Sequence, residues 1–445
     1  MRAQSRRRIT AALAGLAVVA TTALTGIATT TAVAASGVMT PAIGAHPQYQ
    51  VAGHVSSSPA ATTFGCQLTT PAGCYGPAQM RAAYGVDKLA KFGLDGTGKT
   101  IVIIDAFQSP TITSDLATFD TLFGLSAPKL NIIAPDGLTP FDQSSADQTS
   151  WAGEITLDVE YSHAIAPNAT IDLVLSKSDQ DADILSAQKF VIDNNLGDAL
   201  SQSFGEAEQC QATSIMQATH KLYQKAARED MTVFASSADQ GAALPTCDGT
   251  SFFKAVSTPA SDPLVTAVGG TILDANGITG AYNSEQVWNE PNFGAAGGGG
   301  FSTVYSTPSF QRGLHLASRG VPDISYNAAI IGGVLAVWSS SGQGANLVFR
   351  FGGTSAGSPQ WAALTVLADQ LGHHRVGDIN PALYHLAHGA LYGALFHDIT
   401  VGDNTFHGGA TTIQGFSATP GWDAASGLGT PKANLLVPAL ALVSH

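Results

Sequence analysis

From about Gly76 onward, short runs of consecutive apolar residues alternate with longer segments in which apolar residues recur every three or four positions. The first pattern predicts buried strands and the second predicts helices. The expected strands are Thr100–Phe107, Thr170–Ser176, Ala199–Phe204, Thr232–Ser236, Leu264–Val268, Val334–Trp338 and Leu347–Phe351. The expected helices are Ser114–Leu125, Glu154–Ala164, Ile184–Asn195, Ala212–Arg228, Gln360–Gly372 and Ala382–Leu395. Continuously apolar strands separated by helices predict a doubly wound α/β domain, with a mostly parallel sheet covered by helices on both faces.

The chain divides by composition into three parts. Residues 1–35 begin with four arginines, continue with an apolar stretch from Ala11, and contain the A-x-A site Ala32–Ala34. This is the pattern of a secretory signal peptide, so we expect a secreted, extracellular protein; a membrane anchor is the alternative. Residues 36–75, rich in Ser, Thr, Ala, Gly and Pro, are expected to be a linker or short pro-segment. Residues 76–445 are expected to form a single catalytic domain.

Composition excludes several kinds of partner. The 445 residues include 20 Lys and Arg against 33 Asp and Glu, a formal net charge of −13, and only 12% of residues are charged. An acidic chain without basic clusters is a poor ligand for nucleic acid or an anionic membrane surface, so we expect neither partner once the signal is removed. A hydrophobic content of 44% argues against disorder. We expect a monomer.

Four cysteines bear on the compartment and on metal binding. Cys66, Cys74, Cys210 and Cys247 allow three complete pairings, of which Cys66–Cys74 with Cys210–Cys247 joins the closest in sequence. Export permits disulfides, and the absence of a C-x-x-C pair argues against a zinc or redox site.

One motif match is misleading. Gly93–Thr100 fits G-x-x-x-x-G-K-T, the phosphate-binding loop. That loop must follow a strand and open a helix, whereas here it leads straight into the expected strand at 100–107. We therefore interpret it as a glycine-rich turn.

A candidate nucleophile lies between an expected strand and an expected helix. Ser355 belongs to Gly353–Pro359, which follows the strand ending near Phe351 and precedes the helix at 360–372. The positive end of a helix beside such a serine favours an oxyanion. The same string satisfies G-x-S-x-G, so a serine esterase with Asp398 and His407 is an alternative.

Three acidic residues complete the candidate chemistry. Glu154 and Asp158 are four residues apart, which on a helix places both carboxyls on one face and predicts a shared proton. Asp239 follows the strand at 232–236, at the sheet edge where α/β proteins place their sites. Asp105 could begin a subtilisin triad with a histidine, but no suitable histidine segment follows, and His163 lacks the glycine context.

Taken together, these residues resemble the sedolisin family, the serine-carboxyl peptidases with a subtilisin-like fold. The resemblance covers about residues 75–435 and places Ser355 at the nucleophile, Glu154 and Asp158 at the E-x-x-x-D pair and Asp239 at the oxyanion aspartate. It implies peptide hydrolysis in acid through an acyl-enzyme, with Glu154 as general base and polypeptides as substrates, either internally or as N-terminal tripeptides. A catalytically inactive, calcium-stabilised binding module is the alternative from another class.

The resemblance also implies one structural Ca²⁺ ion near the C-terminus. His397–Thr400 and Pro420–Asp423 resemble the family's calcium site. Carried over, the ligands are the carboxylates of Asp398 and Asp423 and the carbonyls of Ile399, Thr419 and Gly421, hard oxygen donors of the kind Ca²⁺ prefers.

Three departures from the family pattern are visible in the sequence. Ala238 and Gln240 flank Asp239 where the family usually has Gly and Ser, and Phe204 stands where relatives often have Trp. Only some 40 residues separate the expected signal from the catalytic region, so the family's large folded pro-domain is not expected here. Whether activation needs self-cleavage is left open.

Overall fold

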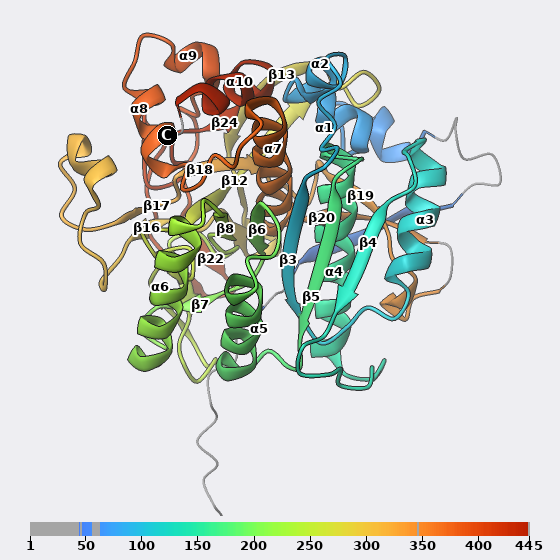
Figure 1. The fold of residues 1–445 in the computed structure, drawn as a ribbon, viewed down its shortest axis with the longest axis horizontal. Helices are drawn as coiled ribbons and strands as arrows, with labels where there is room; N and C mark the ends of the chain where they lie inside the picture. The colour runs from blue at the N-terminus through green and yellow to red at the C-terminus, as the bar shows by residue number, and fades with distance from the viewer. Residues whose placement is uncertain (1–43, 45–46, 56–62, 345–346, 444–445) are drawn as a thin grey trace, which may run out of the picture. The chain divides into compact units, whose positions relative to one another are not determined.

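The central feature of the fold is an eight-stranded sheet (Figure 1). The structure is a computed structural model that describes residues 44, 47–55, 63–344 and 347–443, all within one compact unit from Thr40 to His445. The expected signal peptide lies outside the described residues. The order is β13-β12-β8-β6-β3-β5-β4, with β18 also paired to β12, and all pairs are parallel except β12 with β13. The bounds are β3 Thr100–Ala106, β4 Lys129–Ile133, β5 Thr170–Ser176, β6 Ala199–Gln202, β8 Thr232–Ser236, β12 Thr266–Ala275, β13 Tyr282–Val287 and β18 Ile324–Asn327.

Helices cover both faces of this sheet, as the sequence predicts. Alternate residues of β3 point to opposite sides: Ile101 and Ile103 join the larger core, and Val102 and Ile104 join a separate one. The first core includes α4 (Ala146–Ile165) and α7 (Gly357–Gly372), and the second includes α5 (Asp181–Asp193) and α6 (Thr213–Arg228). The other helices are α1 Pro77–Ala83, α2 Val86–Ala90, α3 Ile112–Phe123, α8 Asn380–Ala387, α9 Tyr392–Leu395 and α10 Ala433–Val443.

Helix α4 is enclosed on every side. All residues from Trp151 to Ile165 are buried, including charged side chains. It packs against α7, α3 and the strands β3 and β5. The sequence predicts only the part from Glu154; the helix begins earlier because Ser145 caps it, accepting a hydrogen bond from the backbone N–H of Gln148 at 3.3 Å.

A second, four-stranded sheet corrects two expectations. Its order is β1-β20-β19-β2, formed by β1 Gln48–His54, β20 Leu347–Gly352, β19 Gly333–Val337 and β2 Cys74–Tyr75. The strands expected at 334–338 and 347–351 therefore pair antiparallel here instead of joining the parallel sheet. Part of the expected linker, residues 36–75, is also strand β1. Tyr49 explains why this stretch is ordered, because its ring packs edge-on against Trp338, with 4.9 Å between centroids, and against Phe349.

The segments outside the two sheets contain further pairs of short strands. They are β7 Glu206–Ala207 with β11 Ser257–Thr258, β9 Ala243–Pro245 with β10 Phe252–Lys254, β14 Asn289–Glu290 with β15 Ala295–Ala296, β16 Gly300–Phe301 with β17 Gly320–Val321, β21 Phe396–His397 with β24 Thr430–Pro431, and β22 Phe406–Gly408 with β23 Thr411–Ile413.

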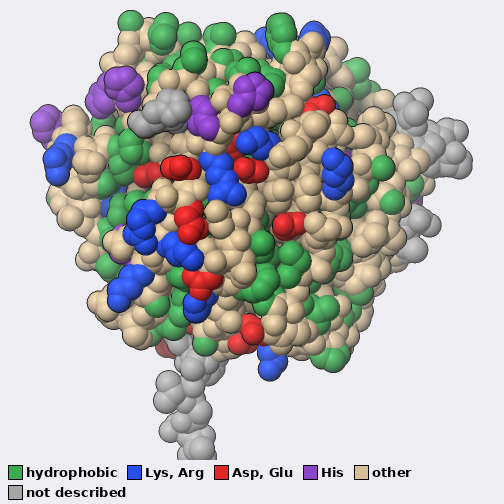
Figure 2. Space-filling model, in the orientation of Figure 1, with side chains coloured by type: hydrophobic (Ala, Val, Ile, Leu, Met, Phe, Trp, Pro, Cys, Tyr) green, Lys and Arg blue, Asp and Glu red, His purple; other side chains and the backbone are tan. Residues whose placement is uncertain are grey.

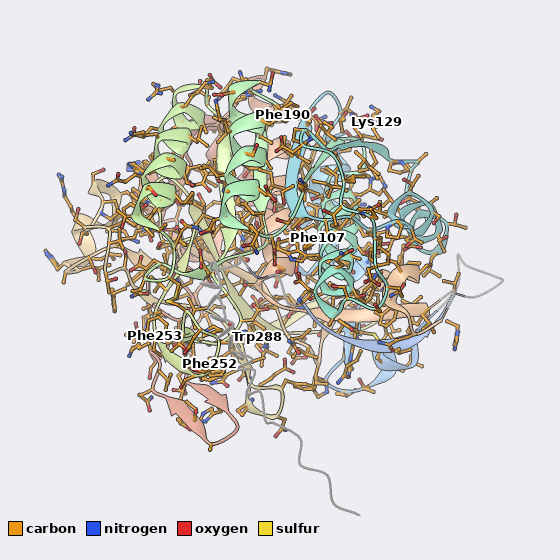
Figure 3. The ribbon with its side chains drawn as sticks, turned by 90° about the horizontal axis from the view of Figure 1, so that it is seen from below. Phe107, Lys129, Phe190, Phe252, Phe253 and Trp288 are labelled. Atoms are coloured by element: carbon orange, nitrogen blue, oxygen red, sulfur yellow. A yellow bond between two sulfur atoms is a disulfide. The ribbon has the colours of Figure 1, made fainter. Side chains whose placement is uncertain are left out.

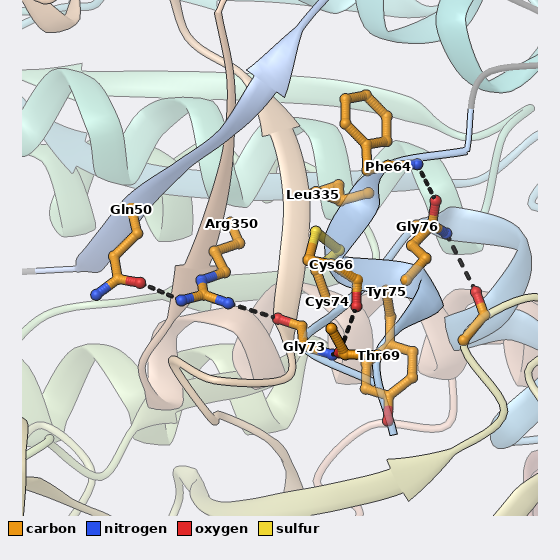
Figure 4. Close-up of a disulfide and its surroundings, with 12 residues drawn as sticks. Gln50, Phe64, Cys66, Thr69, Gly73, Cys74, Tyr75, Gly76, Leu335 and Arg350 are labelled. Atoms are coloured by element: carbon orange, nitrogen blue, oxygen red, sulfur yellow. Dashed lines mark hydrogen bonds between the residues drawn. A yellow bond between two sulfur atoms is a disulfide. The ribbon is translucent and has the colours of Figure 1, made fainter. Parts of the chain in front are cut away.

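Both disulfides join the cysteines that are closest in sequence. Cys66 bonds to Cys74 beside strand β2 (Figure 4), and Cys210 bonds to Cys247. The first disulfide closes a short loop next to β1 and β20. It therefore holds β2, the edge strand that contains Cys74, to the segment just before it. Within the part of the chain that the structure describes, no helix is long and apolar enough to span a membrane.

The loop that mimics a phosphate-binding motif is a turn, as expected. It runs directly into β3, and several of its backbone N–H groups already donate within the protein. The N–H groups of Asp95 and Gly96 donate to Oε1 of Gln370 at 3.0 and 2.8 Å. Gly96 has a φ of +87°, and a Cβ there would lie 2.8 Å from the side chain of Ala169, so only glycine fits.

Charged side chains on the face seen in Figure 2 are sparse, and both signs are interspersed over α5 and α6. The ammonium group of Lys225 on α6 lies 2.9 Å from the carboxylate of Asp193 on α5 and 3.8 Å from that of Glu229. The ion pair with Asp193 ties the two helices together. This mixed face is not the basic stripe that nucleic acid requires.

Candidate active site

Ser355 lies in a tight turn between β20 and α7, at the strand-to-helix junction that the sequence predicts. The turn, Thr354–Ala356, leads directly into the helix, and Ser355 is only 5% exposed. Gly353 enters it with a φ of +126°, and a Cβ there would lie 2.8 Å from Oδ2 of Asp239. Glycine is therefore required for the approach that brings Asp239 beside the serine turn.

Ser203 links the serine to the carboxyl pair. The Ser355 hydroxyl donates to the carbonyl of Ser203 at 3.4 Å, and the Ser203 hydroxyl donates to Oδ1 of Asp158 at 2.8 Å. Ser203 follows β6, whose carboxyl end meets the site. The sequence assigned no role to this serine; in the structure it lies between Ser355 and Asp158 and contacts both.

Glu154 and Asp158 are fully buried, one turn apart on α4. Burial raises the pKa of Glu154 well above its usual range, and the charges of Asp158 and Asp105 raise it further. The nearby Ser355 hydroxyl acts in the opposite direction, although neither oxygen of Glu154 has a hydrogen-bond partner among the described residues. Burial also raises the pKa of Asp158. Two carboxyls buried this close together cannot readily both ionise.

A third carboxyl, that of Asp105, belongs to this cluster. The sequence did not predict its presence there. Asp105 lies in β3, is fully buried, and both its oxygens lack a hydrogen-bond partner among the described residues. Burial and the charge of Asp158 raise its pKa well above the usual range. Two residues further on, Phe107, labelled in Figure 3, has a φ of +60°.

Asp239 is held beside the turn that carries Ser355. Its Oδ1 accepts hydrogen bonds from the backbone N–H of Thr354 at 2.8 Å and from the Thr354 hydroxyl at 2.9 Å. Burial raises the pKa of Asp239 to about 6, against the lowering effect of these two donors. Below that pH its carboxyl is neutral and has a proton to donate.

The residue before Asp239 is strained. Ala238 has a φ of +92°, a region that residues with a Cβ rarely occupy. Its carbonyl accepts from the N–H of Gly298 at 2.7 Å, and its N–H donates to the Thr354 hydroxyl at 3.2 Å. This conformation explains why the family usually has glycine here, and the surrounding hydrogen bonds explain how alanine is tolerated.

The histidines considered in the sequence do not reach Ser355. His163 lies 3.0 Å from Oδ1 of Asp120, in contact with α3, and His407 lies 3.4 Å from the Thr412 hydroxyl within a hairpin. Asp398 accepts from the Tyr392 hydroxyl at 3.0 Å. Among the described residues, no hydrogen bond or ion pair joins any of these side chains to the serine, so the esterase triad has no support.

The residues expected to bind calcium lie in two neighbouring loops. The N–H of Gly421 donates to both carboxylate oxygens of Asp398, at 3.1 and 3.2 Å. Asp423 accepts from the N–H groups of Thr419 and Ala425, both at 2.9 Å. Among the described residues, no group of three or more His, Cys, Asp or Glu side chains is placed to hold a metal. The two carboxylates are hard oxygen donors of the kind that Ca²⁺ prefers.

A parallel sheet with helices on both faces and a serine at the start of a helix defines a protein of the subtilisin-like class. A solved structure of this class, "Pseudomonas sedolisin (serine-carboxyl proteinase) complexed with two molecules of pseudo-iodotyrostatin", matches with a TM-score of 0.70 and 27% identity, over 84% of this chain and 99% of that one. No family model matches the chain.

Curated relatives identify the family. Kumamolisin from Bacillus sp. (strain MN-32) is 34% identical over 377 residues, which are 82% of this chain and 63% of that protein. Sedolisin from Pseudomonas sp. (strain 101) is 31% identical, covering 74% of this chain and 56% of that one, and tripeptidyl-peptidase 1 from Rattus norvegicus is 30% identical, covering 64% and 51%. The chain belongs to the sedolisin family. It spans between half and two thirds of the length of these relatives.

Proposed function

We propose that this chain is a secreted peptidase that hydrolyses peptide bonds in acid, through an acyl-enzyme on Ser355. One observation carries the proposal: a serine at the start of a helix lies beside a buried carboxyl cluster and beside Asp239, while the described histidines considered for a triad lie elsewhere. Carboxyls, rather than histidine, are then the groups that move protons at this site.

Glu154 is the proposed general base. It takes the proton from the Ser355 hydroxyl as the oxygen attacks the substrate carbonyl, and it returns that proton to the leaving amine. Water then attacks the acyl-enzyme by the same route and restores the serine. Because Glu154, Asp158 and Asp105 form one coupled cluster, loss of a single proton leaves one negative charge, and proton transfer places that charge on Glu154.

Asp239 is the proposed oxyanion donor. Its protonated carboxyl, beside the turn of Ser355, donates to the oxygen that becomes negative in the tetrahedral intermediate. Because the pKa of Asp239 is about 6, this donor is present only in acid. Activity should therefore fall as the pH rises through about 6 and Asp239 loses its proton.

The remaining assignments are part of the same proposal. Residues 1–35 would be the signal peptide and 76–445 the peptidase domain, and the two disulfides suit an extracellular protein. One Ca²⁺ ion would be held by the carboxylates of Asp398 and Asp423 with carbonyls of Ile399, Thr419 and Gly421. When bound, the ion would neutralise these carboxylates and brace the two loops. Polypeptides are the proposed substrates, and we propose a monomer.

The test uses purified protein at pH 4 with a denatured protein as substrate. We expect peptides to be released, and we expect Ser355→Ala to abolish their release while leaving the melting temperature within a few degrees. Persistent activity in Ser355→Ala would show that another residue is the nucleophile. Mass spectrometry of the products distinguishes internal cleavage from removal of N-terminal tripeptides, the activity that the name of one relative states.

A further inference from the structure

The disulfide between Cys210 and Cys247 joins two loops that each carry a residue of the site. Cys210 lies on the segment after β6, which begins at Ser203. Cys247 lies on the segment after β8, which contains Asp239. The bond therefore links the loop that contacts Ser355 covalently to the loop that carries the proposed oxyanion donor.

The loop before Cys210 is held by strand pairing and by a buried carboxyl. Its strand β7 pairs with β11, and the N–H of Cys210 donates to the carbonyl of Ala207 at 2.8 Å. Between these two residues, Glu208 is only 2% exposed, and its carboxylate accepts from the Ser302 hydroxyl at 2.7 Å. Cys210 is thus a firmly attached point to which the second loop is bonded.

The second loop runs from Asp239 out to the surface. The carbonyl of Asp239 accepts from the N–H of Ala296 at 2.9 Å, and the N–H of Gly241 donates to the carbonyl of Ala296 at 2.8 Å. The chain then forms β9, which pairs with β10, and Cys247 is an exposed residue in the turn between these two strands. The disulfide therefore holds the outer end of a hairpin that starts beside Asp239.

Side chains of both loops meet in one small apolar cluster. Its buried members are Ala207, Leu244 and Ala255, against which Cys210, Ala238 and Phe253 (labelled in Figure 3) pack. The cluster thus includes one half of the disulfide and the residue next to Asp239. The φ of +92° at Ala238 is a strained conformation, which persists only where the surrounding structure holds it. Packing against this cluster is part of that restraint.

We propose that the Cys210–Cys247 disulfide is a positioning element of the active site, which keeps Asp239 directed at the reacting carbonyl through the apolar cluster that contains Ala238. The inference rests on the proposed function, because it takes Asp239 as the oxyanion donor. Such a donor acts only within hydrogen-bond distance of the developing charge, and a displacement of about 1 Å can lower the rate about 10²-fold. A hairpin that is free to move by this amount loses the donor without losing the fold.

The other disulfide supplies a matched control. Cys66 and Cys74 are 8 positions apart and brace the edge strand β2 of the second sheet, and neither lies on the loops that follow β6 and β8. Loss of either bond lowers stability, and the bond that closes the longer loop stabilises more. Activity is therefore compared at a temperature at which circular dichroism shows every chain to be folded.

The test uses full-length chains in which one cysteine pair is replaced, Cys210→Ser with Cys247→Ser or Cys66→Ser with Cys74→Ser. The substrate is a fluorogenic peptide at pH 4. We expect loss of Cys210–Cys247 to lower kcat about tenfold or more and to leave KM within twofold, because the donor acts in the transition state. Loss of Cys66–Cys74 should leave both constants within twofold.

Repeating the comparison in Asp239→Ala separates positioning from a general loosening of the site. With no carboxyl left to position, loss of Cys210–Cys247 should lower kcat less than twofold further, measured at raised enzyme concentration. A bond that only stabilises the fold would lower kcat by the same factor with and without Asp239.

If the serine pair folds poorly, the Cys210–Cys247 bond is opened in the parent chain with dithiothreitol. The dithiol gives two electrons and two protons to the bond, which becomes two thiols, and is itself oxidised to a cyclic disulfide. Alkylation and mass spectrometry identify the open bond, and activity should fall as Cys210–Cys247 opens and return on reoxidation.

The outcomes distinguish this inference from the proposed function. An unchanged kcat after loss of Cys210–Cys247, or equal losses with and without Asp239, would overturn positioning and leave the proposed function standing. Inactivity of the parent chain at every pH would overturn the proposed function and this inference with it.

Discussion

Asp105 and Asp158 are buried carboxyls on different elements, β3 and α4, and the charge of Asp158 raises the pKa of Asp105. Their mutual repulsion extends to Glu154, whose pKa both of them raise. Burial raises the pKa of the proposed base most, and a residue from another part of the chain raises it further.

Replacing Asp105 should move the acid limb of the activity profile. Asp105→Asn removes a carboxyl whose charge raises the pKa of Glu154, so that pKa falls and Glu154 ionises at lower pH. We expect the acid limb of kcat/KM to shift downward by about one pH unit. Glu160→Gln is the control, because Glu160 is buried on the same helix but accepts from the N–H of Val337 at 2.9 Å, outside the cluster. An unchanged profile in Asp105→Asn would remove Asp105 from the proton-sharing unit.

Replacing Asp239 with asparagine should change the alkaline limb of the pH profile of activity. The amide N–H₂ of Asn donates at every pH, whereas the Asp239 carboxyl loses its proton near pH 6. We expect Asp239→Asn to lose the fall in rate near pH 6 while keeping part of the activity. Asp239→Ala has no donor, and its kcat should drop about 10²–10³-fold. An alkaline limb that persists in Asp239→Asn would have to come from another group.

The fold should be more stable in acid than near neutrality. Burial raises the pKa of Asp239 to about 6, of Asp369 to about 7 and of Glu206 to about 8. The unfolded chain loses these protons near pH 4, so the folded state binds more protons between pH 4 and 8. Their contribution to stability is complete below about pH 4 and is lost as the pH rises through 6 to 8.

Melting temperatures at pH 4, 6 and 8, at constant ionic strength, test this sign. We expect a steady fall with rising pH. Asp369→Asn should reduce the slope, because this residue would no longer titrate, and Asn can still accept from the N–H of Val376, the partner of Asp369 at 2.7 Å. Asp142→Asn serves as the control, because hydrogen bonds to Ser144 lower the pKa of Asp142. A melting temperature that rises with pH contradicts the prediction.

Relief of strain at Ala238 should stabilise the fold. With a φ of +92°, Ala238 is held in a conformation that glycine adopts without steric cost. We expect Ala238→Gly to raise the free energy of unfolding by about 0.5–1 kcal/mol, as measured by urea denaturation. Ala235→Gly, in the buried strand β8, should do the reverse, because alanine there has ordinary strand geometry and a buried methyl group. Destabilisation of similar size by both changes would argue against strain.

The strands of the central sheet were predictable where their apolar runs are continuous. The runs at 170–176 and 232–236 match β5 and β8 residue for residue, because both are buried over almost their whole length and end at polar residues. Strand β12 extends seven residues beyond its predicted end, because the antiparallel partner β13 pairs with the backbone of its second half. The helix predicted at 382–395 is two helices, α8 and α9, with Gly389 between them.

Parts of the site could not be found from spacing along the chain. Asp105 meets Asp158 only because β3 lies under α4, and Ser203 meets Ser355 only because β6 ends beside the start of α7. Strand β1 was missed because its register depends on β20, some 300 residues later. The sequence shows Ala238 only as a departure from the family's usual glycine, and its backbone conformation became visible only in the structure.

Helix α4 also limits how this protein can be engineered. Since every residue from Trp151 to Ile165 is buried, the helix has no outward surface on which substitutions are free. Random libraries that span it will be dominated by chains that do not fold, whatever their effect on Glu154. Attempts to shift the working pH should therefore leave this helix intact and vary the loops after β6 and β8, which carry Ser203 and Asp239.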